Sequence, residues 1–204
     1  MINPNRFWRL AAAAACVVGI AANAGAREDD LSFPPEWAPH EAVWMGWTDT
    51  IARREELQAL WAQVLRALTP HVTVKLLAAS PDVAEQARNA LAPRGVDFTN
   101  IRFVIQPTTD MWLRDSGPLF ITDGKRKAIA DFRWAFYGAP SPYADPGRFA
   151  RGQLDAQAAV GLGIARRRSP VVAEGGGLDV NSATLIAYKD AAMHRNPSVP
   201  LEQL

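Results

Sequence analysis

The chain has 204 residues, 49% of them hydrophobic, and its 22 basic and 21 acidic residues leave a formal net charge of +1. A hydrophobic fraction of this size is enough for a packed core and argues against intrinsic disorder. The near-zero charge and the lack of a Lys/Arg stripe argue against a surface that binds nucleic acid. The length suits one domain or part of a larger one.

Residues 1–26 have the pattern of a secretory signal peptide. Arg6 and Arg9 precede an apolar run over 10–22, and small residues follow it as cleavage sites. The run is too short to span a membrane comfortably, although an uncleaved anchor is the alternative. We therefore expect an exported protein, periplasmic or secreted, with no stable membrane span. The only cysteine is Cys16, so a mature chain over 27–204 has no thiol for catalysis, a disulfide or a metal site.

Beyond the leader, hydrophobic periodicity and turn residues predict alternating strands and helices. Strands are predicted at 42–47, 72–78, 101–105, 119–122, 128–132, 170–173, 178–180 and 184–186. Helices are predicted at 51–68, from Pro81 to Gly95, and at 148–163. Residues 133–147 are rich in aromatic residues, proline and glycine. They predict a long irregular loop, which either carries function or seals a sheet edge.

Local residue types also predict the structure of several shorter segments. The three arginines at 166–168 resemble the solvated end of a helix. His194 falls in a polar connection. Residues 198–202 resemble the first turn of a helix, and a single turn is not stable alone. This suggests that the 204 residues are the front portion of a longer product.

Two of the predicted strands each lead into an acidic loop. The strand at 101–105 precedes DMWLRDSGP at 110–118, and the strand at 170–173 precedes Glu174 and three glycines. Glycines allow close backbone approach. In the simplest alternatives, Arg114 pairs with a neighbouring aspartate to close a turn, and Glu174 is merely solvated. A phosphate cradle is disfavoured, because no Lys-Ser/Thr follows the glycines.

The acidic side chains and the tryptophan between them suggest a ligand. Asp110, Asp115, Glu174 and Trp112 would form an electronegative pocket with an aromatic wall, which matches a flat cation such as a guanidinium. Breaking a guanidinium requires a strong nucleophile such as a thiolate, and a histidine to move protons. The histidines lie in no obvious catalytic context: His40, His71 and His194.

The sequence also resembles a known family through four segments in chain order. They are FPPEWAPHEAVWMGW at 33–47, DMWLRDSGP at 110–118, EGGG at 174–177 and RNP at 195–197. These are similar to the agmatine deiminases, which belong with the Porphyromonas-type peptidyl-arginine deiminases in the guanidine-modifying (pentein) superfamily. The resemblance implies an α/β fold, a five-bladed propeller of ββαβ modules that is incomplete here. Residues 27–204 would be the N-terminal portion of its catalytic domain.

The same resemblance implies roles for two candidate catalytic carboxylates. Asp115 would hold the substrate guanidinium, and Glu174 would lie in the catalytic core near the family's histidine. The family's reaction hydrolyses a guanidine to a ureido group and ammonia through a covalent thiol intermediate, without a metal or other cofactor. For agmatine the product is N-carbamoylputrescine, on the way to putrescine.

Four further residues are candidate substrate-binding residues. By the resemblance, Trp112 would lie against the substrate, while Asp110 and Arg114 would support the loop. Glu36 is a candidate partner for the charged tail of agmatine, which needs a partner of its own.

The chain departs from the family pattern in its nucleophile. Nothing here matches the family's His-x-Asp motif or its cysteine, so this polypeptide is expected to be inactive even if a longer form is an enzyme. The leader differs from the cytoplasmic agmatine enzymes and keeps peptidyl-arginine as an alternative substrate. A secreted carboxylate-pair hydrolase with tryptophan sugar platforms, a non-catalytic cation binder, and self-association into a homo-oligomer are also left open.

Overall fold

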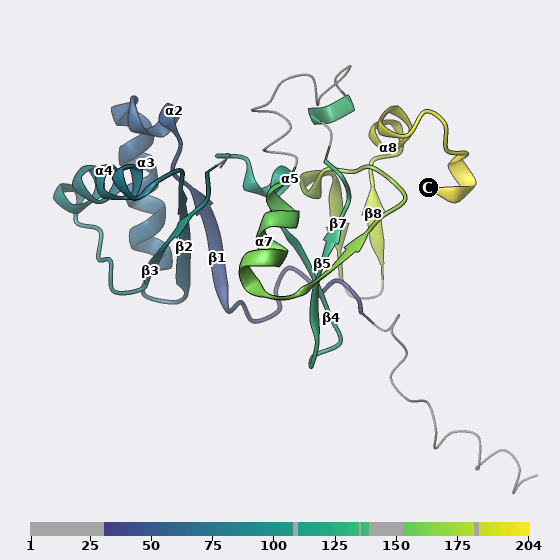
Figure 1. Ribbon diagram of the computed structural model, residues 1–204, viewed down its shortest axis with the longest axis horizontal. Helices are drawn as coiled ribbons and strands as arrows, with labels where there is room; N and C mark the ends of the chain where they lie inside the picture. The colour runs from purple at the N-terminus through teal and green to yellow at the C-terminus, as the bar shows by residue number, and fades with distance from the viewer. Residues whose placement is uncertain (1–30, 108–109, 135, 139–152, 182–183) are drawn as a thin grey trace, which may run out of the picture. The chain divides into compact units, whose positions relative to one another are not determined.

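The computed structural model describes residues 31–107, 110–134, 136–138, 153–181 and 184–204 (Figure 1). The predicted signal peptide at 1–26 therefore lies outside the described residues, as do residues 139–147 of the predicted loop and residues 148–152 of the predicted third helix. Within the described ranges, no helix is both long enough and apolar enough to cross a membrane. Residues 32–204 group as one compact unit.

The first sheet consists of three parallel strands in the order β1-β2-β3. They are β1 (Ala42–Gly46), β2 (Thr73–Ala78) and β3 (Ile101–Ile105). Helices α3 (Glu55–Leu68) and α4 (Pro81–Leu91) connect the strands and pack on the sheet. The core between them is apolar and includes Trp47, Ile51, Leu65, Leu76 and Leu91, all fully buried. Burial of these side chains is the main stabilisation of this part of the chain.

Local residue chemistry sets the helix ends around this sheet. The Ser80 hydroxyl accepts a hydrogen bond from the Val83 N–H at 3.3 Å, and Pro81 occupies the first turn of α4. A short 3₁₀ helix, η2 (Ala92–Arg94), then ends at Gly95, whose φ of +73° favours glycine.

The predicted helix at 51–68 is in fact two helices. Helix α2 (Asp49–Ala52) ends before Arg54, which has an extended backbone and precedes α3. Glu55 and Glu56 lie in the first turn of α3, where negative charge stabilises a helix N-terminus. The new start at these acidic residues explains the break.

The second sheet has the order β4-β5-β6, with β4 antiparallel to β5 and β5 parallel to β6. Its strands are β4 (Leu119–Thr122), β5 (Lys127–Asp131) and β6 (Ala165–Arg168). The predicted hairpin between β4 and β5 is confirmed: Gly124 has φ +87°, and Asp123 Oδ1 accepts two backbone N–H bonds. Helix α7 (Leu154–Leu162) packs on β5.

Two sequence predictions were wrong beside this sheet. The arginines at 166–168 form strand β6 instead of a helix end, because their side chains reach the buried Asp131 at the end of β5, at 3.6 Å for Arg166 and 4.0 Å for Arg168. Residues 170–173 form no strand. The Asn196 side chain instead forms hydrogen bonds with both main-chain groups of Val172. It accepts a hydrogen bond from the N–H at 2.8 Å and donates one to the carbonyl at 2.9 Å.

The third sheet is the predicted hairpin of β7 (Leu178–Val180) and β8 (Leu185–Ala187), whose turn includes residues 182–183 outside the described residues. Helix α8 (Lys189–Arg195) follows, so placing His194 in a connection was wrong. The predicted helix start at 198–202 is a 3₁₀ helix, η6 (Leu201–Gln203). Three short helices carry the candidate site: α5 (Leu113–Ser116), η3 (Phe136–Gly138) and η5 (Gly175–Gly177).

Candidate active site

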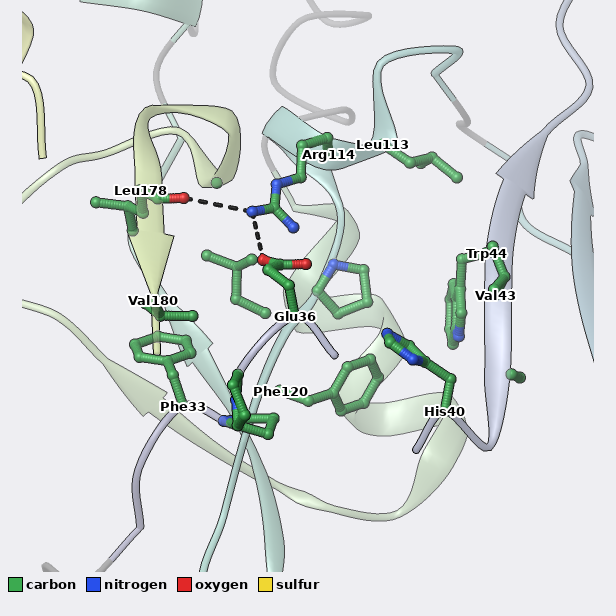
Figure 2. A pocket seen from close by; sticks show the side chains of 16 residues that line it. Phe33, Glu36, His40, Val43, Trp44, Leu113, Arg114, Phe120, Leu178 and Val180 are labelled. Atoms are coloured by element: carbon green, nitrogen blue, oxygen red, sulfur yellow. Dashed lines mark hydrogen bonds and ion pairs between the residues drawn. The ribbon is translucent and has the colours of Figure 1, made fainter. Parts of the chain in front are cut away.

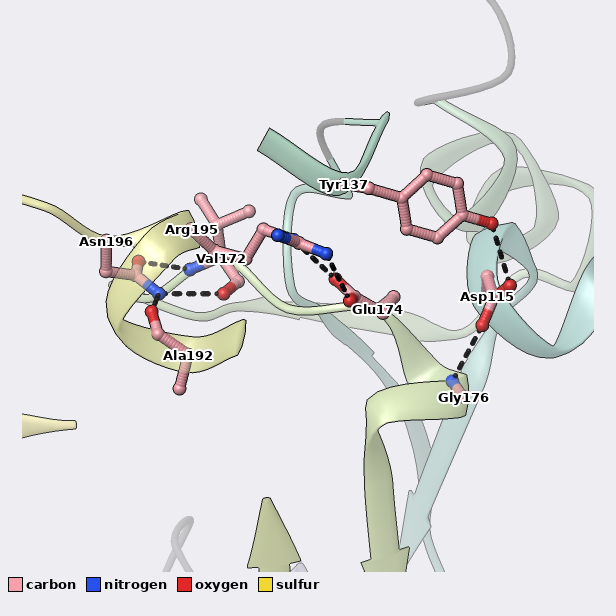
Figure 3. A network of polar contacts seen from close by, with 8 residues as sticks. All are labelled: Asp115, Tyr137, Val172, Glu174, Gly176, Ala192, Arg195 and Asn196. Carbon is pink, nitrogen blue, oxygen red and sulfur yellow. Dashed lines mark hydrogen bonds and ion pairs between the residues drawn. The ribbon is translucent and has the colours of Figure 1, made fainter. Parts of the chain in front are cut away.

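Asp115 lies on α5 and is held by two neutral donors from distant segments (Figure 3). The Tyr137 hydroxyl donates to Oδ2 at 2.8 Å, and the Gly176 N–H donates to Oδ1 at 3.1 Å. Neither donor carries charge, and no ion pair to Asp115 occurs in the described part of the chain. The carboxylate is therefore fixed in orientation while its negative charge remains available to a cation.

The glycines after Glu174 are required by the closeness of this contact. A Cβ at Gly176 would lie 2.1 Å from Asp115 Oδ1, and one at Gly175 would lie 2.3 Å from the Arg114 carbonyl oxygen. No side chain fits at such distances, so the segment must be glycine for η5 to lie against α5. The close backbone approach expected from the glycines is present. The carboxylate that the glycine backbone contacts is Asp115 and not the neighbouring Glu174.

Glu174 is paired with Arg195, the last residue of α8 (Figure 3). Arg195 Nη2 donates to Oε1 at 2.8 Å and Nε to Oε2 at 3.0 Å, and each side chain is only 12% exposed. This two-point fork is the strongest geometry for an arginine and a carboxylate. Glu174 is therefore neither solvated, as one alternative had it, nor free to turn.

Tyr137 lies between the two carboxylates. Its hydroxyl reaches Asp115, and the Arg195 guanidinium lies 5.8 Å from the centroid of its ring. Partial burial, the hydrogen bond to Asp115, and the negative charges of Asp115, Asp110 and Glu174 raise the pKa of the Tyr137 phenol well above its usual value. The phenol thus stays protonated and remains a donor. The structure in this way brings the predicted Asp115 and Glu174 into one network.

Trp112 and Asp110 line a cavity beside this network. Asp110 Oδ1 accepts the Trp112 N–H at 3.0 Å, and the Trp112 side chain is 62% exposed. The cavity has a volume of about 650 Å³, and Asp49, Trp134 and Tyr137 also line it. Carboxylates among aromatic faces suit an organic cation.

Arg114 and Glu36 border a different cavity (Figure 2). Arg114 Nη2 donates to Glu36 Oε1 at 2.6 Å and to the Leu178 carbonyl at 3.3 Å. The alternative in which Arg114 pairs with a neighbouring aspartate, Asp110 or Asp115, is therefore wrong. The hydrogen bond from Arg114 lowers the pKa of Glu36. Arg114 ties its loop to β7, as a supporting residue would.

The Glu36 pair borders a separate apolar cavity of about 410 Å³ (Figure 2). Its other lining residues include Phe33, His40, Trp44 and Phe120, and it contains none of the side chains of Asp115, Trp112 or Glu174. Glu36 thus lies outside the cavity of Trp112 and is engaged by Arg114, which does not favour it as the partner of a substrate tail.

Sequence reasoning missed two members of the network, Tyr137 and Arg195. Tyr137 lies in the predicted loop at 133–147, which was a candidate for function, but nothing in the sequence distinguishes Tyr137 from the other residues of that loop. Arg195 was noted only within the RNP segment. No spacing rule relates an arginine to a glutamate 21 positions earlier, so only the folded chain reveals the pair.

The only cysteine of the sequence, Cys16, lies outside the described residues, so the described site contains no thiol. Among the described residues, no group of three or more histidine, cysteine, aspartate or glutamate side chains is arranged to hold a metal ion.

Comparison with known proteins places this arrangement in a family. The family model for Porphyromonas-type peptidyl-arginine deiminase matches residues 32–204. The chain belongs to this family. A putative agmatine deiminase of Streptomyces coelicolor is 34% identical over 185 residues, 84% of this chain and 51% of that protein. Agmatine deiminase of Ectopseudomonas mendocina is 31% identical over 183 residues, 83% of this chain and 46% of that protein.

Solved structures of the Porphyromonas-type deiminase family and its relatives share the fold. The X-ray structure of a putative agmatine deiminase has a TM-score of 0.70 at 20% identity, covering 86% of this chain and 49% of its own. Agmatine deiminase of Enterococcus faecalis has a TM-score of 0.68 at 19% identity, with the same coverage. The predicted α/β pentein fold, incomplete in this chain, is confirmed. The chain spans about half the length of the curated relatives it matches.

Proposed function

We propose that the protein contributes the guanidinium-binding half of a deiminase that hydrolyses agmatine to N-carbamoylputrescine and ammonia, in putrescine formation. The observation that supports this is Asp115, a carboxylate oriented by two neutral donors, one of which, Tyr137, lines the aromatic cavity. Family membership and the agmatine deiminases among its relatives support the reaction class.

In this proposal, the described residues bind and orient the substrate. Asp115 accepts N–H bonds from the guanidinium, and Trp112 offers an aromatic face to it. Glu174, whose charge is balanced by Arg195, stays fixed in the same network. The thiolate forms a bond to that carbon, ammonia leaves with a transferred proton, and water then releases the ureido product. The thiol would come from polypeptide outside these 204 residues, and this chain alone would be inactive.

Peptidyl-arginine is the second candidate substrate. The family description names it, and the signal-like residues 1–26 support our further proposal that the protein is exported, where free agmatine and exposed arginyl peptides would both be accessible. A carboxylate-pair hydrolase is less well supported, because both oxygens of Glu174 are engaged by Arg195 and are poorly placed to donate a proton.

Calorimetric titration of the chain with agmatine tests the proposal. Putrescine is the matched control ligand, because it has an amine tail but no guanidinium. We expect agmatine to bind in preference to putrescine, and Asp115→Asn to weaken agmatine at least about tenfold by removing a charge-assisted contact. Equal binding of the two ligands, or an unchanged affinity in Asp115→Asn, would contradict the proposal. Titration with an N-acetyl-arginine amide then compares agmatine with an arginyl peptide.

A further inference from the structure

We propose that Tyr137 is a positioning residue, which holds Asp115 with its hydroxyl and Arg195 with its ring so that the two candidate carboxylates keep a fixed spacing. This inference deepens the proposed function and rests on it. It concerns a residue from the long aromatic loop, to which neither the family resemblance nor the sequence pattern gives a role.

The hydroxyl of Tyr137 completes a two-point support for Asp115. Oδ2 receives the phenol O–H at 2.8 Å, and Oδ1 receives the backbone N–H of Gly176 at 3.1 Å. One donor on each oxygen sets both the position and the rotation of the carboxylate group. Without the phenol, only the Gly176 contact would remain in the described network, and the carboxylate could rotate about it.

The ring of Tyr137 connects this support to Glu174. The guanidinium of Arg195 lies 5.8 Å from the ring centroid, and the same guanidinium holds both oxygens of Glu174. The Tyr137 ring also packs edge to face against the buried Trp134, with ring centroids 5.6 Å apart and ring planes at 87°. Tyr137 thus joins the buried Trp134 to the supports of both acids. Figure 3 shows Tyr137 with Asp115 and Arg195.

The backbone supports a role for this side chain beyond filling a turn. Tyr137 has φ +60°, and Phe136 before it has φ +49°. Residues other than glycine rarely adopt this left-handed region, because it is strained for a residue with a side chain. A glycine would serve a simple turn without this strain. Tyr137 is also 44% exposed, so core packing alone does not account for a large aromatic residue there.

The decisive variant is Tyr137→Phe, which keeps the ring and its contacts with Trp134 and Arg195 while it removes the hydroxyl. Tyr188→Phe is the matched control, because Tyr188 is 70% exposed and outside the network. Two measurements are made on the whole chain: the affinity for agmatine relative to putrescine, and the rate of amide hydrogen exchange at Gly176.

We expect Tyr137→Phe to weaken agmatine about tenfold, as for loss of a hydrogen bond to a charged group, with putrescine unaffected. The Gly176 amide should exchange severalfold faster, because its acceptor on Asp115 becomes mobile. Tyr188→Phe should change neither quantity, and the melting temperature of both variants should stay near that of the parent chain.

The outcomes separate this inference from the proposed function. If the parent chain binds agmatine and Tyr137→Phe binds it equally well, the positioning role is wrong, whatever the exchange rate. If the parent chain does not bind agmatine, the proposed function fails, and the exchange rate alone decides the inference. In that case, an unchanged rate at Gly176 overturns it and a faster rate supports it.

Discussion

Arg195 holds Glu174 with two near-parallel hydrogen bonds of 2.8 and 3.0 Å, and water reaches only 12% of either side chain. Arg195 is the last residue of α8, and Glu174 directly precedes the glycines of η5. The next residue, Asn196, pairs with the main chain of Val172, two positions before Glu174. Two consecutive residues thus fix the path and the side chain of one candidate catalytic acid.

Removal of Arg195 should destabilise the protein strongly. Arg195→Met leaves Glu174 with an unpaired, mostly buried charge, and we expect a loss of about 3–5 kcal/mol in the free energy of unfolding. Arg195→Lys keeps the charge but loses the fork, so its effect should be smaller. Urea denaturation measures both. The control is Arg53→Met, whose pair with Asp49 is exposed and should contribute less than about 1 kcal/mol. A similar loss in all three variants would contradict the role of burial.

Addition of one methyl group at Gly176 should displace Asp115. In Gly176→Ala, the Cβ would lie 2.1 Å from Oδ1, so α5 and η5 must separate, and we expect agmatine binding at least about tenfold weaker. Gly161→Ala is the control, because its Cβ meets nothing within 4 Å and it lies in α7. That change should stabilise the chain by about 0.5–1 kcal/mol. Calorimetry and thermal melting measure the two effects, and normal affinity in Gly176→Ala would refute the close approach.

The stability of the chain should fall as pH rises from about 4 to about 7. Burial, followed by the hydrogen bond to Asp131 and the charge of Asp131, raises the pKa of Asp155 from 3.8 to about 7. The folded chain therefore keeps a proton that the unfolded chain loses in this range, so the slope of the unfolding free energy with pH is negative. Above pH 7 this contribution levels off.

Asp155→Asn should remove that slope and stabilise the chain at pH 8 relative to its parent. Arg166 and Arg168 face Asp131, and the Arg133 N–H donates to it, so Asp131 keeps these partners in the variant. Urea denaturation at pH 5 and pH 8 measures the slope. The exposed Asp179→Asn serves as the control and should leave it unchanged. A persistent slope in Asp155→Asn would show that another group is responsible.

Glu36→Gln should leave agmatine affinity nearly unchanged. Glu36 is held by Arg114 beside a cavity that contains neither Asp115 nor Trp112, and the pair is about half exposed. Its loss should lower stability by at most about 1 kcal/mol. Asp110→Asn, in the cavity of Trp112, should weaken agmatine severalfold because it removes negative charge. Calorimetry measures the agmatine affinity of both variants. A larger loss of affinity in Glu36→Gln than in Asp110→Asn would support Glu36 as a substrate partner.

The sequence was sufficient where structure depends on local chemistry. The Ser80 and Pro81 start of α4 and the turn at Asp123 and Gly124 follow from residues near in the chain. Asp115 and Glu174 could be proposed as neighbours because each follows an apolar segment that was predicted to be a strand, although residues 170–173 form none.

The remainder depends on contacts between distant residues. Strand β6 forms where arginines meet the buried Asp131, and residues 170–173 are held by the Asn196 side chain in place of a neighbouring strand. The partners of the two acids, Tyr137 and Arg195, lie 22 and 21 positions away from them. No periodicity or turn rule relates residues at such separations, so these contacts could not be predicted.

The Arg195 fork has a consequence for any guanidine chemistry at this site. A catalyst that attacks guanidino carbons here would have one of its own within the same network, and conversion of that arginine to citrulline would take away the charge that balances Glu174. Such an enzyme would inactivate itself. Glu174 contacts one edge of the Arg195 guanidinium, and the ring of Tyr137 lies over one of its faces. These contacts leave less of the Arg195 guanidino carbon open to attack. The same two residues that arrange the site would thereby spare the protein from its own reaction.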